Sequence, residues 1–248
     1  GGCALHDLTL ISFDGIPGSG KSSTALWLGE LLEKKGVSVR VVAEHETPHP
    51  VRFLTDLKKP LRPWGETRPH DFSEACLGKF TRFLEGVAAG LRSPTVIIVD
   101  GLLFHTDSTS LLLMDPDKGF FDRHVAAMHH IALQRIRCRP VLLYNQPHAG
   151  GLPRTMEQRP EAWSRLQIHW KLGSPFCKAR KLRGSRGYIQ FYAHYEKRIY
   201  DLFKALPLAA DAHLVLENPA MDWSASREKI WSFCSRHVLH TQFFNNLL

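Results

Sequence analysis

The sequence predicts an α/β fold with three layers, in which helices cover both faces of a five-stranded parallel sheet. Five short runs rich in Val, Ile and Leu are apolar on both faces, as buried parallel strands are: residues 8–13, 37–43, 95–99, 140–144 and 212–216. Helical periodicity fits residues 21–35, 72–91, 120–137, 160–171, 188–206 and 222–237. This alternation of strands and helices indicates βαβ units with right-handed crossovers.

The chain has 248 residues, of which 44% are apolar and 23% charged, and these are values typical of globular proteins. We expect a single domain over residues 1–248. Two stretches interrupt the regular pattern. Residues 46–69 are rich in Pro and predict a long irregular loop, and residues 148–186 carry Gly and Pro around one short helix. We interpret the second stretch, at about 148–187, as a mobile excursion from the domain.

The formal net charge is +8, which suits a partner that is a nucleic acid, an anionic membrane or a small phosphorylated molecule. Most of the excess lies in one place, because residues 150–190 hold nine Lys or Arg and only two acids. Five widely spaced Cys without a CxxC motif argue against a disulfide framework. No apolar run is long enough to cross a membrane, and no secretion signal is visible, so we expect a cytoplasmic protein without a membrane partner.

The strongest motif follows the first predicted strand. Residues 15–22 read Gly15-Ile16-Pro17-Gly18-Ser19-Gly20-Lys21-Ser22 and fit G-x-x-x-x-G-K-[ST] in full. In such a loop, backbone N–H groups and the helix N-terminus surround phosphate oxygens, the Lys reaches the β- and γ-phosphates, and the Ser hydroxyl binds Mg²⁺. The predicted cofactors are therefore ATP and Mg²⁺. The predicted cofactor-binding residues are Gly15, Gly18, Ser19, Gly20, Lys21, Ser22 and Ser23.

Three acids follow predicted strands at the edge of the sheet where ligands bind in open α/β folds. Asp100 ends the third strand and is the second predicted ligand of Mg²⁺, together with Ser22. Asp14 ends the first strand and Glu44 ends the second. Glu44 is the preferred base for the acceptor hydroxyl, and Asp14 is the second choice.

The class of nucleotide-binding protein follows by elimination. The N-K-x-D element with which GTPases recognise guanine is absent from the sequence, and the chain has no room for the extra domains of mechanical ATPases and transporters. A small kinase with its own lid remains.

Residues 11–23, with an acid before the glycine loop, resemble the opening of thymidylate kinases and deoxynucleoside kinases. This resemblance implies the strand order 2-3-1-4-5 and gives Glu44 the role of base. Residues 157–163 and 178–190 look similar to the lid region of uncharacterised bacterial P-loop kinase-like proteins. The sequence departs from both kinase groups after the third strand, where Asp100 is followed by Gly101 and the usual Arg is missing.

Lid arginines in small kinases close over the phosphates and neutralise the charge that develops during transfer. Three of them lie in or beside the short helix after the fourth strand and are ranked first. Arg159 is predicted to be catalytic, with Lys21, Glu44 and Asp100, whereas Arg154 and Arg165 are predicted to bind substrate, with Asp14 and Glu44. Further cations serve the lid or a separate anion site: Arg180, Lys181, Arg183 and Arg186.

The sequence thus predicts an ATP- and Mg²⁺-dependent phosphotransferase that moves the γ-phosphate to a hydroxyl or phosphate of a small, nucleoside-like or antibiotic-like molecule. The alternative is a nucleotide-dependent switch that binds nucleic acid through residues 178–186. This alternative is disfavoured, because that segment has no aromatic residue on which a base could stack. The acceptor, the choice between ATP and GTP, and the oligomeric state stay open.

Overall fold

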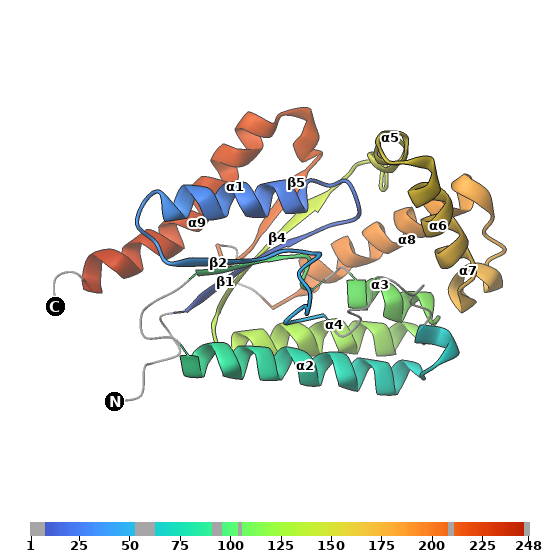
Figure 1. Ribbon diagram of the computed structural model, residues 1–248, viewed down its shortest axis with the longest axis horizontal. Helices are drawn as coiled ribbons and strands as arrows, with labels where there is room; N and C mark the ends of the chain where they lie inside the picture. Colours follow the sequence, from blue (N-terminus) through green and yellow to red (C-terminus); the bar gives the residue numbers. More distant parts are fainter. Residues whose placement is uncertain (1–7, 53–62, 91–95, 104–105, 208–210, 246–248) are drawn as a thin grey trace.

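The computed structural model describes residues 8–52, 63–90, 96–103, 106–207 and 211–245. Its centre is a five-stranded parallel sheet in the order β2-β3-β1-β4-β5, which confirms the predicted order 2-3-1-4-5 (Figure 1). The strands are β1 (Thr9–Asp14), β2 (Val39–Val42), β3 (Val96–Asp100), β4 (Arg137–Tyr144) and β5 (Leu214–Glu217). β4 begins three residues before its predicted start. The prediction was too short because Arg137 and Arg139, which alternate with the buried Cys138, interrupt the apolar pattern.

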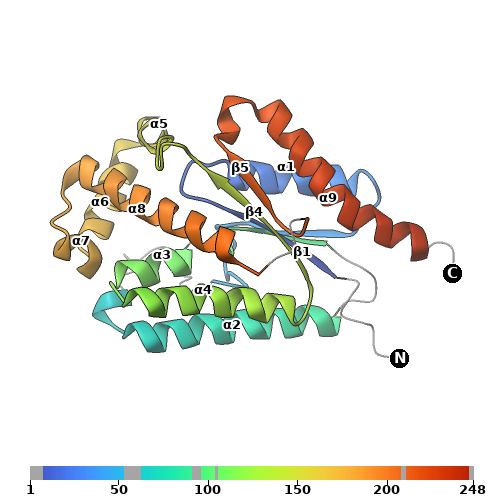
Figure 2. The same cartoon turned by 180° about the vertical axis from the view of Figure 1, so that it is seen from behind.

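Helices cover both faces of the sheet (Figures 1 and 2). On one face lie α1 (Lys21–Glu33) and α9 (Trp223–Asn245), and on the other lie α2 (Pro69–Gly90), α3 (Thr106–Leu113), α4 (Lys118–Leu133) and α8 (Gly184–Ala205). Alternate residues of β1 point to opposite faces, so that Ile11 and Phe13 join the core beneath α1 while Leu10 joins the larger core on the other side. The predicted three-layer α/β/α architecture is therefore confirmed.

Several short helices of the structure were not predicted from the sequence. Where one short helix was predicted after β4, the structure has α5 (Leu152–Gln158), α6 (Glu161–Leu172) and α7 (Pro175–Ala179). α7 begins at a Ser-Pro pair in which the Ser174 hydroxyl accepts a hydrogen bond from the Cys177 N–H, a regular helix start that reads as a turn in the sequence. α3 was missed because its polar residues resemble a loop, although Ser108, Thr109 and Ser110 are buried.

The remaining helices were predicted with other bounds, and the largest difference is in α9, which ends eight residues after its predicted end. α2 begins three residues earlier than predicted and α8 four, whereas α4 ends four residues earlier. The predicted irregular loop contains a 3₁₀ turn at Pro63–Gly65, and residues 53–62 of it lie outside the described part of the chain. In the described residues, no helix combines the length and apolar character needed to span a membrane.

Glu196 fastens the β4–α5 connection to α8. Its side chain is fully buried, and its carboxylate accepts hydrogen bonds from the backbone N–H groups of Asn145 and Ala149 and from the side-chain amide of Asn145. Burial raises the pKa of Glu196, and the hydrogen bonds from these donors oppose that rise. The carboxylate thus fixes the point at which the chain leaves the sheet for α5.

We expect Glu196→Ala to lower the free energy of unfolding by about 2–4 kcal/mol, since it leaves several buried N–H donors without an acceptor. Denaturant unfolding monitored by circular dichroism measures the effect. The control is Asp201→Ala on the same helix, which removes an exposed ion pair with Lys197 and should cost no more than about 0.5 kcal/mol. Equal effects of the two changes would contradict the role given to Glu196.

Candidate functional site

The glycine loop connects β1 to α1 at the edge of the sheet where the strands end (Figure 1). Its turn is closed by a hydrogen bond from the Ser19 N–H to the carbonyl oxygen of Ile16, at 3.2 Å. The Lys21 ammonium group donates to the same carbonyl oxygen at 3.1 Å, and the residue is only 4% exposed. Lys21 is therefore folded across the loop, at the N-terminus of α1.

Two elements flank this loop closely. Gly18 and Gly20 have φ angles of +81° and +90°, a conformation that favours glycine. A Cβ atom at Gly18 would overlap Thr155 of α5, and one at Gly20 would overlap the ring of Trp223 at the start of α9. The buried Ser19 hydroxyl has no hydrogen-bond partner in the described part of the chain. The loop, called the cradle below, thus packs closely against Thr155 and Trp223, and any larger side chain at 18 or 20 would collide with one of them.

Two buried acids end the strands beside this cradle. Phe13 of β1 is in register with Asp100 of β3, so Asp14 and Asp100 lie at the same edge of the sheet. Asp14 is fully buried and accepts a hydrogen bond from the Ser12 hydroxyl at 2.9 Å. Asp100 is 2% exposed, and among the described residues its Oδ1 atom has no hydrogen-bond partner. A buried carboxylate oxygen in that state is suited to a cation.

Glu44 lies two residues beyond β2 and is paired with a cation that the sequence analysis missed. The guanidinium group of Arg52 is 4.0 Å from the Glu44 carboxylate and also donates a hydrogen bond to the Glu44 carbonyl oxygen. Burial lowers the pKa of Arg52, and the charges of Glu44, Asp107 and Asp100 oppose this shift. The structure therefore brings two of the predicted acids, Glu44 and Asp100, around one buried guanidinium group.

His49 holds Arg52 in this place. Its Nδ1 atom accepts hydrogen bonds from the backbone N–H groups of Val51 and Arg52, at 3.2 and 2.9 Å, and Lys79 donates to the Arg52 carbonyl oxygen at 2.6 Å. Burial and the nearby charges of Arg52 and Lys79 lower the pKa of His49 to about 4, so that the ring is neutral. His49 itself is buried, with 2% of its surface exposed.

One feature of the sequence points to a role for Arg52 in the site. It is a cation close to Glu44 along the chain, and the usual Arg after Asp100 is missing. The local pattern did not show that the loop folds back onto the end of β2.

The predicted lid arginines lie on exposed surfaces. Arg154 is exposed on α5, and the exposed guanidinium group of Arg159 lies 5.4 Å from the centre of the Trp163 ring. Arg165 is 71% exposed and pairs with Glu161 at 3.3 Å. Among the described residues, none of the three forms a hydrogen bond or ion pair with the glycine loop, and their roles stay predictions. Arg180 supports the fold, because it pairs with Asp115 at 2.8 Å and stacks on the Phe176 ring.

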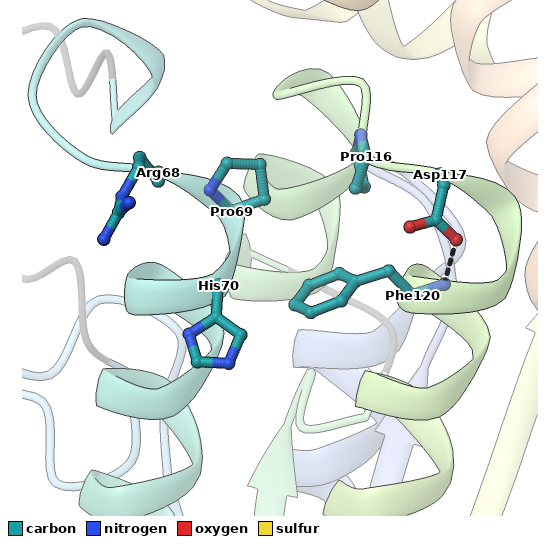
Figure 3. A pocket seen from close by; sticks show the side chains of 6 residues that line it. All are labelled: Arg68, Pro69, His70, Pro116, Asp117 and Phe120. Atoms are coloured by element: carbon teal, nitrogen blue, oxygen red, sulfur yellow. Dashed lines mark hydrogen bonds between the residues drawn. The ribbon is translucent and has the colours of Figure 1, made fainter.

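Two cavities are lined by other parts of the surface. The first, of about 400 Å³, lies between the N-termini of α2 and α4, where Asp117 caps α4 by accepting the Phe120 N–H (Figure 3). The second, of about 640 Å³, lies where α6, α7 and α8 meet. Its basic lining residues are Arg165, Lys178, Lys181 and Arg183, and His169 lies beside them. Three of the predicted cations, Arg165, Lys181 and Arg183, line the second cavity, and no residue of the glycine loop lines either of these two.

Comparison with known proteins gives likeness at the level of structure. No protein-family model matches the sequence, and no curated protein matches it. Similar solved structures include thymidylate kinase from Candida albicans, at 13% identity, 92% coverage of each chain and a TM-score of 0.48. Thymidylate kinase from Ehrlichia chaffeensis covers 85% of this chain and 87% of its own, at 13% identity and a TM-score of 0.45.

Deoxyadenosine kinase from M. mycoides, in a structure with bound dATP, is also similar. It is 14% identical, the match covers 90% of this chain and 97% of the kinase, and the TM-score is 0.44. At such identities the likeness concerns the fold.

Proposed function

We propose that this protein is a P-loop phosphotransferase that uses ATP and Mg²⁺ and transfers the γ-phosphate to a hydroxyl or phosphate group of a small molecule. The observation that supports this proposal most is the buried Asp100 carboxylate at the sheet edge beside the glycine loop, with one oxygen atom that no described residue satisfies. A strand-end carboxylate beside a glycine loop with Lys and Ser is the arrangement that binds Mg²⁺ and phosphates together.

The residues present fit both groups. Ser22 and Asp100 offer a hydroxyl and a carboxylate oxygen, the ligand types that Mg²⁺ prefers. The N–H groups of the cradle and the positive end of the α1 dipole suit the phosphates, and the ammonium group of Lys21 only has to leave the Ile16 carbonyl oxygen to reach them. When bound, Mg²⁺ neutralises phosphate charge and ATP supplies the group that is transferred.

The acid beyond β2 handles the acceptor in this proposal. Glu44 is 23% exposed, so its carboxylate can meet a substrate hydroxyl, accept its proton and orient its oxygen for attack. Arg52 lies beside the Glu44 carboxylate and holds it in place. Arg154, Arg159 and Arg165 belong to the helices after β4 and are proposed to reach the phosphates when that segment closes. We place the reaction in the cytoplasm, as the free thiols of the four described cysteines suit a reducing compartment.

Metal dependence tests this proposal. We expect transfer from γ-labelled ATP to require Mg²⁺ and to stop when EDTA is added. Asp100→Asn should reduce the rate about 10²- to 10³-fold at saturating ATP, because it weakens a charge contact to the metal that stabilises the transition state. Raising the Mg²⁺ concentration should restore part of the loss. A rate that is independent of Mg²⁺, or an Asp100→Asn variant as active as wild type, would remove the metal from the proposal.

A further inference from the structure

Lys171 is a buried cation that the mechanism above does not use. It lies near the end of α6 and is 4% exposed. α6 packs against α8 (Figures 1 and 2). Among the described residues, the single hydrogen-bond acceptor of Lys171 is the side-chain oxygen of Gln167, at 2.7 Å. An ammonium group has three N–H donors, so two of them have no acceptor in the described part of the chain.

Aromatic rings surround this ammonium group. Its nitrogen lies 4.0 Å from the ring centre of Trp170, 5.6 Å from that of Tyr192 and 5.9 Å from that of Tyr188. Trp170 in turn stacks on Trp64, which follows the loop after β2, with 6.4 Å between the ring centres. Ring faces attract a cation, but they do not accept its hydrogen bonds as an anion does.

Among the residues that the structure describes, no acidic side chain forms an ion pair with Lys171. Burial raises the pKa values of Tyr188 and Tyr192, so their hydroxyl groups stay protonated and neutral. The carboxylate whose charge acts on Lys171 is Glu44, which forms its ion pair with Arg52 instead. Burial without a paired anion is costly for an ammonium group and is seldom kept without a functional reason.

We propose that Lys171 binds an anionic group, a carboxylate or a phosphate, on the acceptor whose hydroxyl meets Glu44. This inference rests on the proposed function and adds the class of acceptor to it. The charge of Glu44 also acts on Tyr192, one of the three rings around Lys171. The proposed base and these rings therefore lie in one region. An acceptor with a hydroxyl at one end and an anionic group at the other can span from Glu44 to Lys171 while its body lies on the aromatic rings.

The protonation of Lys171 supports the same conclusion. Burial lowers its pKa to about 7, against a smaller opposing effect of Glu44. An anion bound beside the amine favours the charged form and raises this pKa again. Binding of an anion that does not titrate near neutral pH should therefore be accompanied by uptake of a proton.

Binding of sulfate tests the anion site without any catalysis. The measurement uses the Lys21→Ala background, in which the glycine loop has lost its cation, and follows the indole N–H signal of Trp170 by NMR. We expect saturable binding in Lys21→Ala, and binding that is about 10- to 100-fold weaker after Lys171→Met is added, the usual range for one lost charge-assisted hydrogen bond. Lys178→Met, which removes an exposed cation of the second cavity, is the matched control and should leave the affinity unchanged.

Turnover tests the link to the acceptor. Hydroxylated acceptors are offered in sets of three that differ in one group, which is a phosphate, a carboxylate or neutral. Wild type should prefer one of the two anionic members, and Lys171→Met should raise its KM about 10- to 100-fold with a smaller change in kcat. Lys171→Arg should retain part of the affinity. Lys171→Met should fold at least as stably as wild type, because it replaces a buried cation by an apolar side chain of similar length.

The outcomes separate this inference from the proposed function. Equal sulfate affinity with and without Lys171→Met, or equal use of neutral and anionic acceptors by wild type, overturns the role of Lys171 even if the protein is a kinase. A sulfate site that depends on Lys171, in a protein that transfers phosphate to no acceptor, keeps the anion site and removes the kinase. Loss of stability in Lys171→Met would assign the side chain to the fold instead.

Discussion

Replacing Lys21 by Ala should abolish tight binding of ATP and lower phosphate transfer by about 10³-fold or more. The side chain starts at the N-terminus of α1 and already lies across the glycine loop, so it is placed to neutralise charge on the β- and γ-phosphates as the terminal bond breaks. Titration with a fluorescent ATP analogue measures the binding, and release or transfer of the γ-label measures the turnover.

A matched control separates this effect from a general loss of charge. Lys34→Ala changes an exposed lysine at the other end of the same helix and should leave binding and turnover unchanged. Lys21→Met keeps the buried aliphatic chain and should be as inactive as Lys21→Ala, which excludes a packing defect as the cause. A Lys21→Ala protein that binds ATP as tightly as wild type would contradict the assignment of the glycine loop.

Replacing Glu44 by Gln should lower transfer to a hydroxyl acceptor by about 10²- to 10⁴-fold, the usual contribution of a positioned general base, while ATP binds as before. The amide keeps the shape of the side chain and can stay beside the Arg52 guanidinium group, but it no longer accepts a proton. Steady-state kinetics with saturating ATP, together with a nucleotide-binding titration, separates the loss of chemistry from a loss of binding.

Glu46 provides the control for this prediction. It lies two residues further along the same loop and forms an ion pair with Arg40 at 3.0 Å, so Glu46→Gln removes the same charge without touching the proposed base. We expect a change of less than about threefold in the rate, as for the loss of a surface ion pair. If Glu46→Gln and Glu44→Gln reduce the rate equally, the effect is one of overall charge and the base lies elsewhere.

Local sequence patterns were sufficient for the parallel sheet. A run such as Ile97-Ile98-Val99 is apolar on both faces, and the glycine loop follows a strand of the same kind. Patterns failed where tertiary contacts decide the structure. The Ser- and Thr-rich start of α3 resembles a loop in sequence, although the fold buries these residues and the Ser108 hydroxyl donates to the Leu103 carbonyl oxygen at 2.7 Å.

The same distinction between local patterns and tertiary contacts applies to the residues of the candidate site. Lys21, Ser22, Asp14 and Asp100 could be predicted, because each follows directly from a strand end or a short motif. Arg52 could not, since its position depends on a loop that folds back and is held by His49. Lys171 is one of nine basic residues in a charged segment, and only its burial beneath the rings of α6 and α8 distinguishes it from the exposed ones.

The fate of the γ-phosphate tests the central claim most directly. Wild-type protein is incubated with γ-labelled ATP, Mg²⁺ and a library of small hydroxylated and phosphorylated molecules, with Lys21→Ala in parallel, and the labelled products are separated by chromatography. We predict that the label appears in an organic product with wild type and in no product with Lys21→Ala. Label that appears only as inorganic phosphate, whichever acceptor is offered, would contradict a phosphotransferase and indicate a nucleotide hydrolase.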